Sequence, residues 1–175
     1  MPRDYTGRRY DVIEYDPAWV GRFEREAATV RSVFGADALD IQHVGSTSVP
    51  GMAGKPLIDV SVTVADIADA DRHAAGMVAA GYAEYGDLLG LGGRLFSRED
   101  GGHKLVNVHV FTREHPHGAE MVAIRDFLRA NPDEVCAYAD LKRALFEKYP
   151  DDYAGYRREK DEYMKGVVAR ATAGA

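Results

Sequence analysis

The sequence predicts an α/β protein, with a mixed sheet of four to five strands, helices against the apolar face of the sheet, and a helical C-terminal part. Segments 56–64 and 104–112 alternate apolar and polar residues with the period of two of a half-buried strand. Segment 17–34 has apolar residues at helical spacing, and every element expected after residue 118 is a helix. At 175 residues the chain has the length of one domain. We therefore expect residues 1–175 to form a single domain, with about 118–175 as its helical part.

The N-terminal segment predicts a strand followed by a long helix. Residues 10–15 alternate enough for a short strand. Asp16 suits the N-cap of a helix, and Pro17 suits its first position. One helical face then carries Trp19, Val20, Phe23, Ala27, Val30 and Phe34, and Gly35 ends the helix.

Two strands flank a polar, glycine-rich loop. They are expected over 39–44 and 56–64. In the second strand Val60, Val62 and Val64 share one face, and the opposite face carries Asp59, Ser61 and Thr63. The valine face should pack on helices, whereas the polar face either meets water or lines a cleft.

The middle of the chain predicts a helix, a loop and an alternating strand. Asp66 suits the cap of a helix that ends near Ala80, before Gly81. Residues 82–102 read as a glycine-rich loop with an edge strand over 94–98 and a turn at 100–102. In the strand over 104–112, Asn107 and His109 lie on the face opposite three valines.

Three helices are expected in the C-terminal part. They cover 118–130, then 132 to about 148, then about 153–171. Asn131 and Pro132 suit the cap and first turn of the second helix, and Pro150 breaks the chain before the third.

Composition excludes several classes of protein. The net charge of −6 argues against a nonspecific binder of nucleic acid or of anionic membranes, because such proteins need clustered Lys and Arg. The sequence has no run of about 18 apolar residues, the length expected of a membrane-spanning helix. The single Cys136 allows no internal disulfide, and no apolar segment follows the first charged residues as in a secretory signal. We expect a cytoplasmic protein with a small-molecule partner.

The loop over 45–55 is rich in glycine and hydroxyl groups, which suits an anion site. Gly54-Lys55 invites comparison with the P-loop motif G-x-x-x-x-G-K-[ST]. The comparison fails, because Val49 stands at the position of the first glycine and Pro56 follows the lysine. A strand, not a helix, is expected after the loop.

The run from His43 to Asp59, His-x-Gly-Ser-Thr-Ser-Val-Pro-Gly-x-Ala-Gly-Lys-Pro-x-Ile-Asp, resembles the signature of the GrpB family, also named UPF0157. Segments 125–129, 138–142 and 156–160 are similar to that family as well. The family is placed in the nucleotidyltransferase superfamily. The resemblance therefore implies a nucleotidyltransferase-like mixed sheet flanked by helices, whose helical C-terminal third closes over the sheet.

The resemblance also implies a site. Nucleotidyltransferase folds place a Gly-Ser pair at a strand end and two carboxylates, two residues apart, on the next strand, where two divalent ions clamp the reacting oxygens. Here Gly45 and Ser46 would hold phosphate, and Asp59 would hold metal, but Ser61 stands where the second carboxylate belongs. His109 could act as acid or base beside Asp59. Candidates for binding phosphate or nucleotide are Gly45, Ser46, Thr47, Ser48, Lys55, Arg94, Arg98, Lys104, Arg125, Lys142 and Lys160.

Three functions remain open from the sequence. The first is a nucleotidyltransferase-like protein that binds a nucleotide or another phosphorylated small molecule with Mg²⁺ or Mn²⁺. The second is a non-catalytic binding module with a degenerate metal site. The third is a metal-dependent hydrolase that holds a transition metal through Asp59, His109 and His43.

Overall fold

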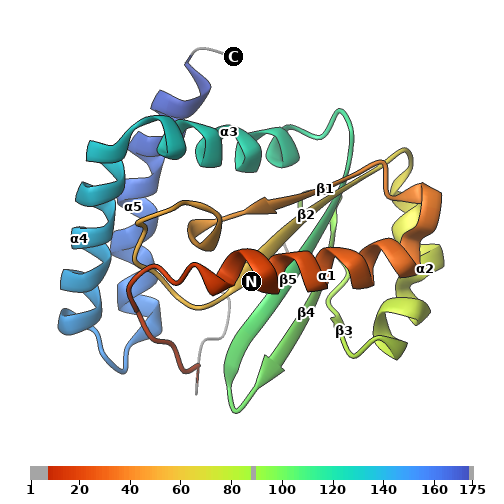
Figure 1. Ribbon diagram of the computed structural model, residues 1–175, viewed down its shortest axis with the longest axis horizontal. Coiled ribbons are helices and arrows are strands. Elements are labelled where there is room, and N and C mark those ends of the chain that lie inside the picture. The colour runs from red at the N-terminus through yellow and green to blue at the C-terminus, as the bar shows by residue number, and fades with distance from the viewer. Residues whose placement is uncertain (1–7, 88–89, 174–175) are drawn as a thin grey trace.

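The computed structural model describes residues 8–87 and 90–173. Their strands form a mixed five-stranded sheet in the order β1-β2-β5-β4-β3 (Figure 1). Central strands β2 and β5 are parallel, and the other neighbours are antiparallel. The strands are β1 (Asp40–Val44), β2 (Ile58–Val64), β3 (Ala83–Glu84), β4 (Arg94–Asp100) and β5 (His103–Thr112). The predicted mixed α/β fold is confirmed.

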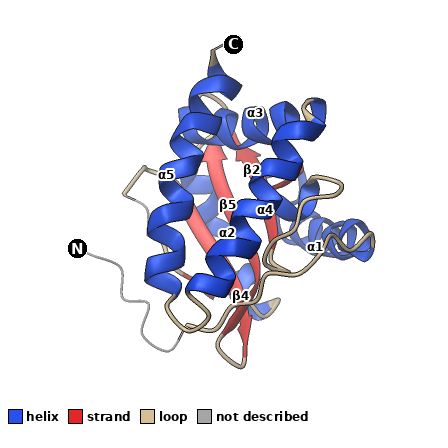
Figure 2. Ribbon diagram, turned by 90° about the vertical axis from the view of Figure 1, so that its left-hand side faces the viewer, coloured by secondary structure: helices blue, strands red, loops and turns tan. Residues whose placement is uncertain are grey.

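Five helices surround the sheet (Figure 2). They are α1 (Ala18–Phe34), α2 (Ile67–Ala79), α3 (Pro116–Ala130), α4 (Pro132–Lys148) and α5 (Tyr153–Thr172). Asp66 caps α2 as predicted, in a reciprocal capping box with Asp69. Short 3₁₀ turns cover Gly35–Asp37 and Ser46–Ser48.

The strand register gives the sheet one apolar and one polar face. Val60 lies between His43 of β1 and Val108 of β5. Asp59 lies between Val44 and Asn107, and its side chain points to the other face. Ser61, two residues after Asp59 in β2, lies between Gln42 and His109 and shares the face of Asp59.

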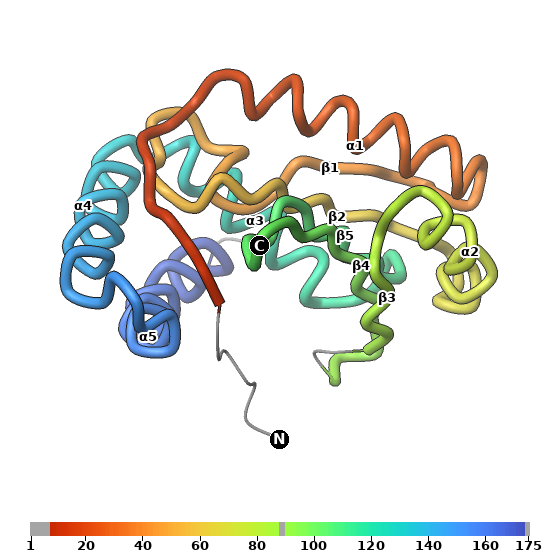
Figure 3. Tube along the Cα trace, turned by 90° about the horizontal axis from the view of Figure 1, so that it is seen from below, coloured from red at the N-terminus to blue at the C-terminus, as the bar shows by residue number. Residues whose placement is uncertain are grey.

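Helices α1 and α2 cover the valine face. The main core joins Trp19 and Phe34 of α1 and Met77 of α2 to Val60 and Val108 of the sheet. Each of these side chains is at most 2% exposed. Figure 3 shows α1 on one side of the sheet and α3 on the other.

A second core holds the loop between β1 and β2 in place. Met52 of this loop packs with Leu128 of α3, Tyr138 of α4 and Val167 of α5. Because the second half of the loop is buried among three helices, the turn at Ser46–Ser48 is held in place directly after β1.

The N-terminal segment joins a third cluster at the C-terminal helices. Tyr10 packs with Leu145, Tyr153 and Tyr156, and its hydroxyl donates to the carbonyl of Tyr149. The prediction of a strand over 10–15 is wrong. In this segment Ile13 pairs with Gly54 in an isolated bridge, and no strand forms. This segment is held by side-chain burial in the helical part and not by strand pairing.

Other boundaries differ slightly from prediction. Helix α3 begins at Pro116, two residues early, because the ring of His115 accepts the N–H of His117 and caps the helix. The predicted loop over 82–102 contains the short strand β3, which forms an edge of the sheet. The strand predicted at the edge over 94–98 is therefore internal, between β5 and β3. Leu88 and Leu89 of that loop lie outside the described residues. None of the helices within 8–87 and 90–173 combines the length and apolar character that crossing a membrane requires.

Candidate functional site

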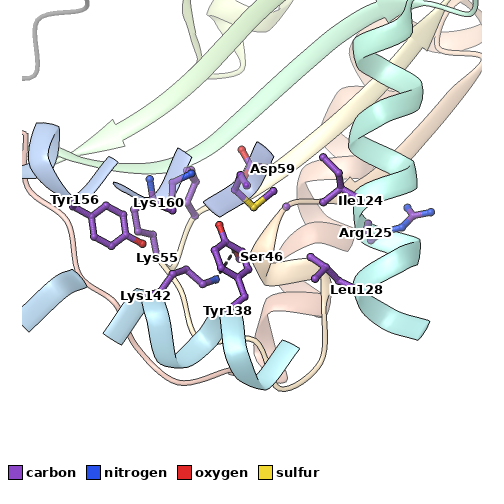
Figure 4. Close-up of a pocket in the computed structure, with 13 residues that line it drawn as sticks. Ser46, Lys55, Asp59, Ile124, Arg125, Leu128, Tyr138, Lys142, Tyr156 and Lys160 are labelled. Atoms are coloured by element: carbon purple, nitrogen blue, oxygen red, sulfur yellow. Dashed lines mark hydrogen bonds between the residues drawn. The ribbon is translucent and has the colours of Figure 1, made fainter. Parts of the chain in front are cut away.

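A small cavity lies between the turn after β1, the start of β2 and helices α3, α4 and α5 (Figure 4). Its volume is about 220 Å³. Its apolar wall is formed by Ile124, Leu128 and Met164. Its polar groups come from four different parts of the chain and are Ser46, Lys55, Asp59, Lys142 and Lys160. The fold thus brings together residues that the sequence separates by more than 100 positions.

A larger cleft of about 780 Å³ adjoins the cavity over the polar face of the sheet. The two share Lys55, Asp59 and Lys160 in their walls. The cleft continues past Asn107 and His109 to Lys104 and Tyr153. A molecule in the cleft could therefore place one end in the cavity.

Asp59 lies at the boundary of the two spaces, in a network of hydrogen bonds. Its Oδ1 accepts from Asn107 Nδ2 at 3.0 Å and from His109 Nε2 at 3.4 Å. Ser97 of β4 holds Asn107 by donating to its Oδ1 at 3.1 Å. These contacts fix the orientation of the carboxylate. His109 Nδ1 is buried without a hydrogen-bond partner within the described residues.

The electrostatics keep Asp59 ionised. Burial alone would raise the pKa of this carboxyl group, but hydrogen bonds from His109 and Asn107 and the charge of Lys55 outweigh burial and lower it. An anionic carboxylate in this place repels other anions, yet it can bridge to them through a divalent cation.

Gly45 lets the turn approach Asp59. It has φ +73°, and a Cβ atom at this position would lie 2.5 Å from Asp59 Oδ2. Contacts below 3.0 Å of this kind force a displacement. The Gly-Ser pair therefore has a physical reason: glycine allows the contact with the carboxylate, and Ser46 then faces the cavity.

Lys142 of α4 is the most unusual cation of the site. Its side chain is buried, and the whole residue is only 2% exposed. Nζ donates to Ser46 Oγ at 2.9 Å and lies 4.3 Å from the centre of the Tyr138 ring, one helical turn away. Within the described residues no carboxylate pairs with this ammonium group. Burial and the charges of Lys160 and Lys55 hold the pKa of Lys142 well below its ordinary value.

The other predicted lysines also reach this region. Lys55 donates to the hydroxyl of Tyr153 at 2.6 Å. Lys160 pairs with Asp161 at 2.6 Å, and Lys104 lies in the larger cleft, 3.7 Å from Glu99. Arg125 touches the cavity wall, but its guanidinium points away from the cavity and donates to Gln42 and to the carbonyl of His43 (Figure 4).

Thr47 and Ser48 serve the turn itself. The Thr47 hydroxyl donates to the carbonyl of Leu57 at 3.1 Å, and the Ser48 hydroxyl donates to the carbonyl of Gly45 at 2.6 Å. Neither residue lines the cavity. Their hydroxyl groups therefore shape the turn, and phosphate binding by these two residues stays a prediction.

His43 does not join the other candidate metal ligands. It projects from β1 to the opposite face of the sheet, where its ring stacks on Phe23 with centroids 4.6 Å apart. Because Thr47 Oγ1 already donates to Leu57, it accepts from His43 Nε2 at 3.0 Å. The set of Asp59, His109 and His43 is not assembled, so the hydrolase based on it is not supported.

Arg94 and Arg98 also lie on the opposite face. They share that face with Phe96, because alternate residues of β4 point the same way. Arg94 pairs with Asp71 of α2 at 2.6 Å, and Arg98 pairs with Glu26 of α1. Both predictions of phosphate contact are corrected, since these arginines tie α1 and α2 to the sheet.

The donor set fits a metal only in part. Within 8–87 and 90–173 no group of three His, Cys, Asp or Glu side chains could hold an ion. On the polar face the neighbours of Asp59 are Ser61, Asn107 and His109, none of which is a carboxylate, so they do not complete a site for two ions. The chain therefore offers a single carboxylate, which holds Mg²⁺ only when phosphate oxygens and water supply the remaining ligands.

Two residues of the site were not selected from the sequence. Tyr138 supports Lys142, and Tyr153 accepts the hydrogen bond from Lys55. The spacing of Tyr138 and Lys142, four residues apart on a helix, was the available signal for the first. The contact between Lys55 and Tyr153 spans 98 positions and has no local signal.

Comparison with known proteins identifies the family. The sequence model of the GrpB protein matches residues 9–170. This chain belongs to the GrpB family.

A solved relative has the same fold. The crystal structure of conserved protein GrpB from Enterococcus faecalis is 32% identical, with a TM-score of 0.86 over 92% of this chain and 96% of that one. The UPF0157 protein YqkA of Bacillus subtilis is 34% identical over 95% of this GrpB chain. The chain spans about half of YqkA, 48% of its length. A dephospho-CoA kinase of Mycobacterium leprae is 26% identical over 91% of this chain, which matches 46% of that protein.

Proposed function

We propose that this GrpB protein binds a nucleotide or another phosphorylated small molecule, with a phosphate group in the small cavity. The observation that carries the proposal is Lys142, a buried ammonium group that bonds a serine hydroxyl and has no carboxylate partner within the described residues. A buried charge is costly unless it is paired. A phosphate between Lys142, Lys55 and Lys160 would supply the missing partner and raise the pKa of Lys142 again.

The arrangement around the cavity supports a nucleotidyltransferase-like use of the site. Gly45 and Ser46 follow β1, and Asp59 lies at the start of neighbouring β2, directly against Gly45. The similarity of this chain to about half of a dephospho-CoA kinase adds an association with nucleotide chemistry.

The proposal includes Mg²⁺ or Mn²⁺ as a partner of the ligand. Asp59 would hold the cation together with phosphate oxygens, which the single carboxylate of the site requires. Such an ion neutralises phosphate charge. His109, which contacts Asp59 and lines the larger cleft, would act as acid or base toward the ligand.

A second candidate is binding without catalysis. The observation that favours it is Ser61, whose side chain lies on the same face as Asp59 where a second carboxylate would be needed. Ser61→Asp restores that carboxylate. Nucleotidyl transfer that appears in Ser61→Asp, and is absent from the parent protein, would favour a degenerate site, whereas transfer by the parent protein would exclude it.

The test of the proposed function is a thermal-shift screen of nucleotides and inorganic pyrophosphate, each with and without Mg²⁺. A ligand at about 100 times its Kd adds about 2.7 kcal/mol, which raises the unfolding midpoint by several degrees. We expect Lys142→Met to lose this shift. The ligand-free variant should be at least as stable as the parent protein, because an unpaired buried charge is replaced by an apolar chain of similar length.

Lys165→Met is the matched control. Lys165 is an exposed lysine of α5 that pairs with Glu162 and does not line the cavity. The control removes the same charge and should keep the full ligand-induced shift. Equal shifts in Lys142→Met and the parent protein would contradict the proposal.

A further inference from the structure

Tyr153 and Lys55 form a close pair in the wall of the larger cleft. Lys55 Nζ donates to Tyr153 Oη at 2.6 Å and lies 4.7 Å from the centre of the ring. Both residues line the cleft, and Lys55 also lines the small cavity. The pair therefore lies between the place proposed for the phosphate and the rest of the ligand.

Several cationic side chains lie near Tyr153. The guanidinium of Arg8 lies 5.5 Å from the centre of the Tyr153 ring. Behind the ring, Tyr10 and Tyr156 pack with centroids at 5.1 and 6.2 Å. The charged and titratable groups near Tyr153 include Arg8, Tyr10, Lys55, Lys104, Tyr156 and Arg157. The acidic groups nearby are Asp151 and Asp152, which precede it in the chain, and Asp161, which pairs with Arg157 in the wall of the same cleft.

We propose that Lys55 and Tyr153 form a proton-accepting pair, in which Tyr153 Oη takes the proton of a hydroxyl group on a molecule bound in the larger cleft. This inference rests on the proposed function, because the hydroxyl belongs to an acceptor that meets the bound nucleotide. As the acceptor oxygen bonds to phosphorus, its proton passes to the phenolate, and the bond from phosphorus to the departing phosphate oxygen breaks. The electron pair of that bond leaves with the departing phosphate.

The charges around Tyr153 agree with this role. Burial alone would raise the pKa of its hydroxyl, but the positive charges of Lys55, Arg157 and Arg8 lower it below the ordinary value for tyrosine. Six tyrosines behave in the opposite way. Burial raises the pKa of Tyr10 to about 12 and also raises those of Tyr82, Tyr85, Tyr138, Tyr156 and Tyr163.

The difference in pKa between Tyr153 and these other tyrosines can be observed by absorption spectroscopy. Tyrosinate absorbs near 295 nm, so a pH titration of the whole protein follows each ionisation. We expect an early step from one tyrosine, ahead of the others. Tyr153→Phe keeps the ring and its packing and should lose this step. Lys55→Met should move the step upward by about one pH unit or more, as removal of a neighbouring opposite charge does.

Tyr85→Phe is the matched control. Tyr85 lines the same cleft, but its pKa is raised, so the early step should remain in this variant. An early step that persists in Tyr153→Phe, or that is missing from the parent protein, would overturn the inference.

Inorganic pyrophosphate separates this inference from the proposed function. Pyrophosphate bound at Lys55 should move the early step to higher pH, because it offsets the charge that favours the phenolate. The early step could be present and unchanged by pyrophosphate, while pyrophosphate also fails to stabilise the protein. That result would reject the proposed function and with it the role of Tyr153 toward an acceptor. Thermal stabilisation by pyrophosphate without an early step would keep the proposed function and reject the pair.

Discussion

Gly45 shows how one missing side chain shapes the site. Its φ of +73° and ψ of −175° belong to a region that is essentially restricted to glycine, and its Cα lies against Asp59. Both features are needed to bring Ser46 to the cavity wall while the carboxylate stays in place.

Gly45→Ala should therefore destabilise the protein in two ways. The backbone conformation costs about 1–3 kcal/mol, and the overlap of Cβ with Asp59 adds to it. Gly35→Ala is the control, since Gly35 has φ +56° and no atom within 4 Å of its Cβ position. Urea unfolding should show a clearly larger loss for Gly45→Ala. Equal losses would mean that the turn moves away from Asp59 at little cost.

The sequence predicted which residues form the site better than it predicted the directions in which side chains point. The sequence predicted Ser46, Asp59, Lys55 and Lys142, and the structure brings them together. It also offered Arg94 and Arg98, because a charged side chain near a strand suggests a ligand but does not reveal which face it occupies. The pairing register settles that direction, and register depends on contacts between strands far apart in the chain.

Elements with strong local signals were predicted well. The alternation of apolar and polar residues predicted β2 and β5. The N-cap residues predicted the first residues of α2 and α4 within about two positions. The segment over 10–15 was misread because its apolar residues serve the helical cluster around Tyr10. A pattern of two to three apolar residues does not distinguish a strand from an irregular segment that packs on helices.

Helix α3 supports the turn through one arginine. Arg129 donates from Nε at 3.0 Å and from a terminal nitrogen at 2.7 Å to the carbonyl of Ser48. The fork of the guanidinium is needed for both bonds. Helix α3 thus holds the turn at Ser48, and Lys142 of α4 bonds the same turn at Ser46.

Arg129→Met should loosen the turn without unfolding the protein. The amides of Ser48 and Val49, which bond the carbonyls of Gly45 and Ser46, should exchange about five- to tenfold faster. Arg158→Met, an exposed arginine of α5, serves as control and should leave these amides unchanged. Unchanged exchange in Arg129→Met would show that burial of Met52 alone fixes the turn.

We expect the response of the whole molecule to acid to depend on His43. Burial lowers the pKa of His43 to about 4, and nearby Arg129 and Arg125 act in the same direction, against Asp59. In the unfolded chain the pKa returns to about 6.5. Between these values the unfolded state binds more protons than the native state, so the free energy of unfolding falls as the pH falls from about 6.5 to about 4.

From this group alone we expect a loss of about 2 kcal/mol between pH 7 and pH 5. His43→Gln provides the comparison, because its amide can still donate to Thr47 but does not titrate. Denaturant unfolding at the two pH values should give a smaller loss for His43→Gln by about that amount. The same loss in both proteins would assign the acid response to other groups.

Tyr10 and its partners have a consequence for the order of events during synthesis. Tyr10 leaves the ribosome first, yet the carbonyl that it bonds follows 139 positions later, and Tyr153 and Tyr156 come later still. Contacts between such distant segments form slowly, and domains assemble as the chain emerges. The sheet with α1 and α2 can form while α5 is still being translated. The wall that holds Tyr153 closes last, so a nascent chain has its sheet before it has a complete site.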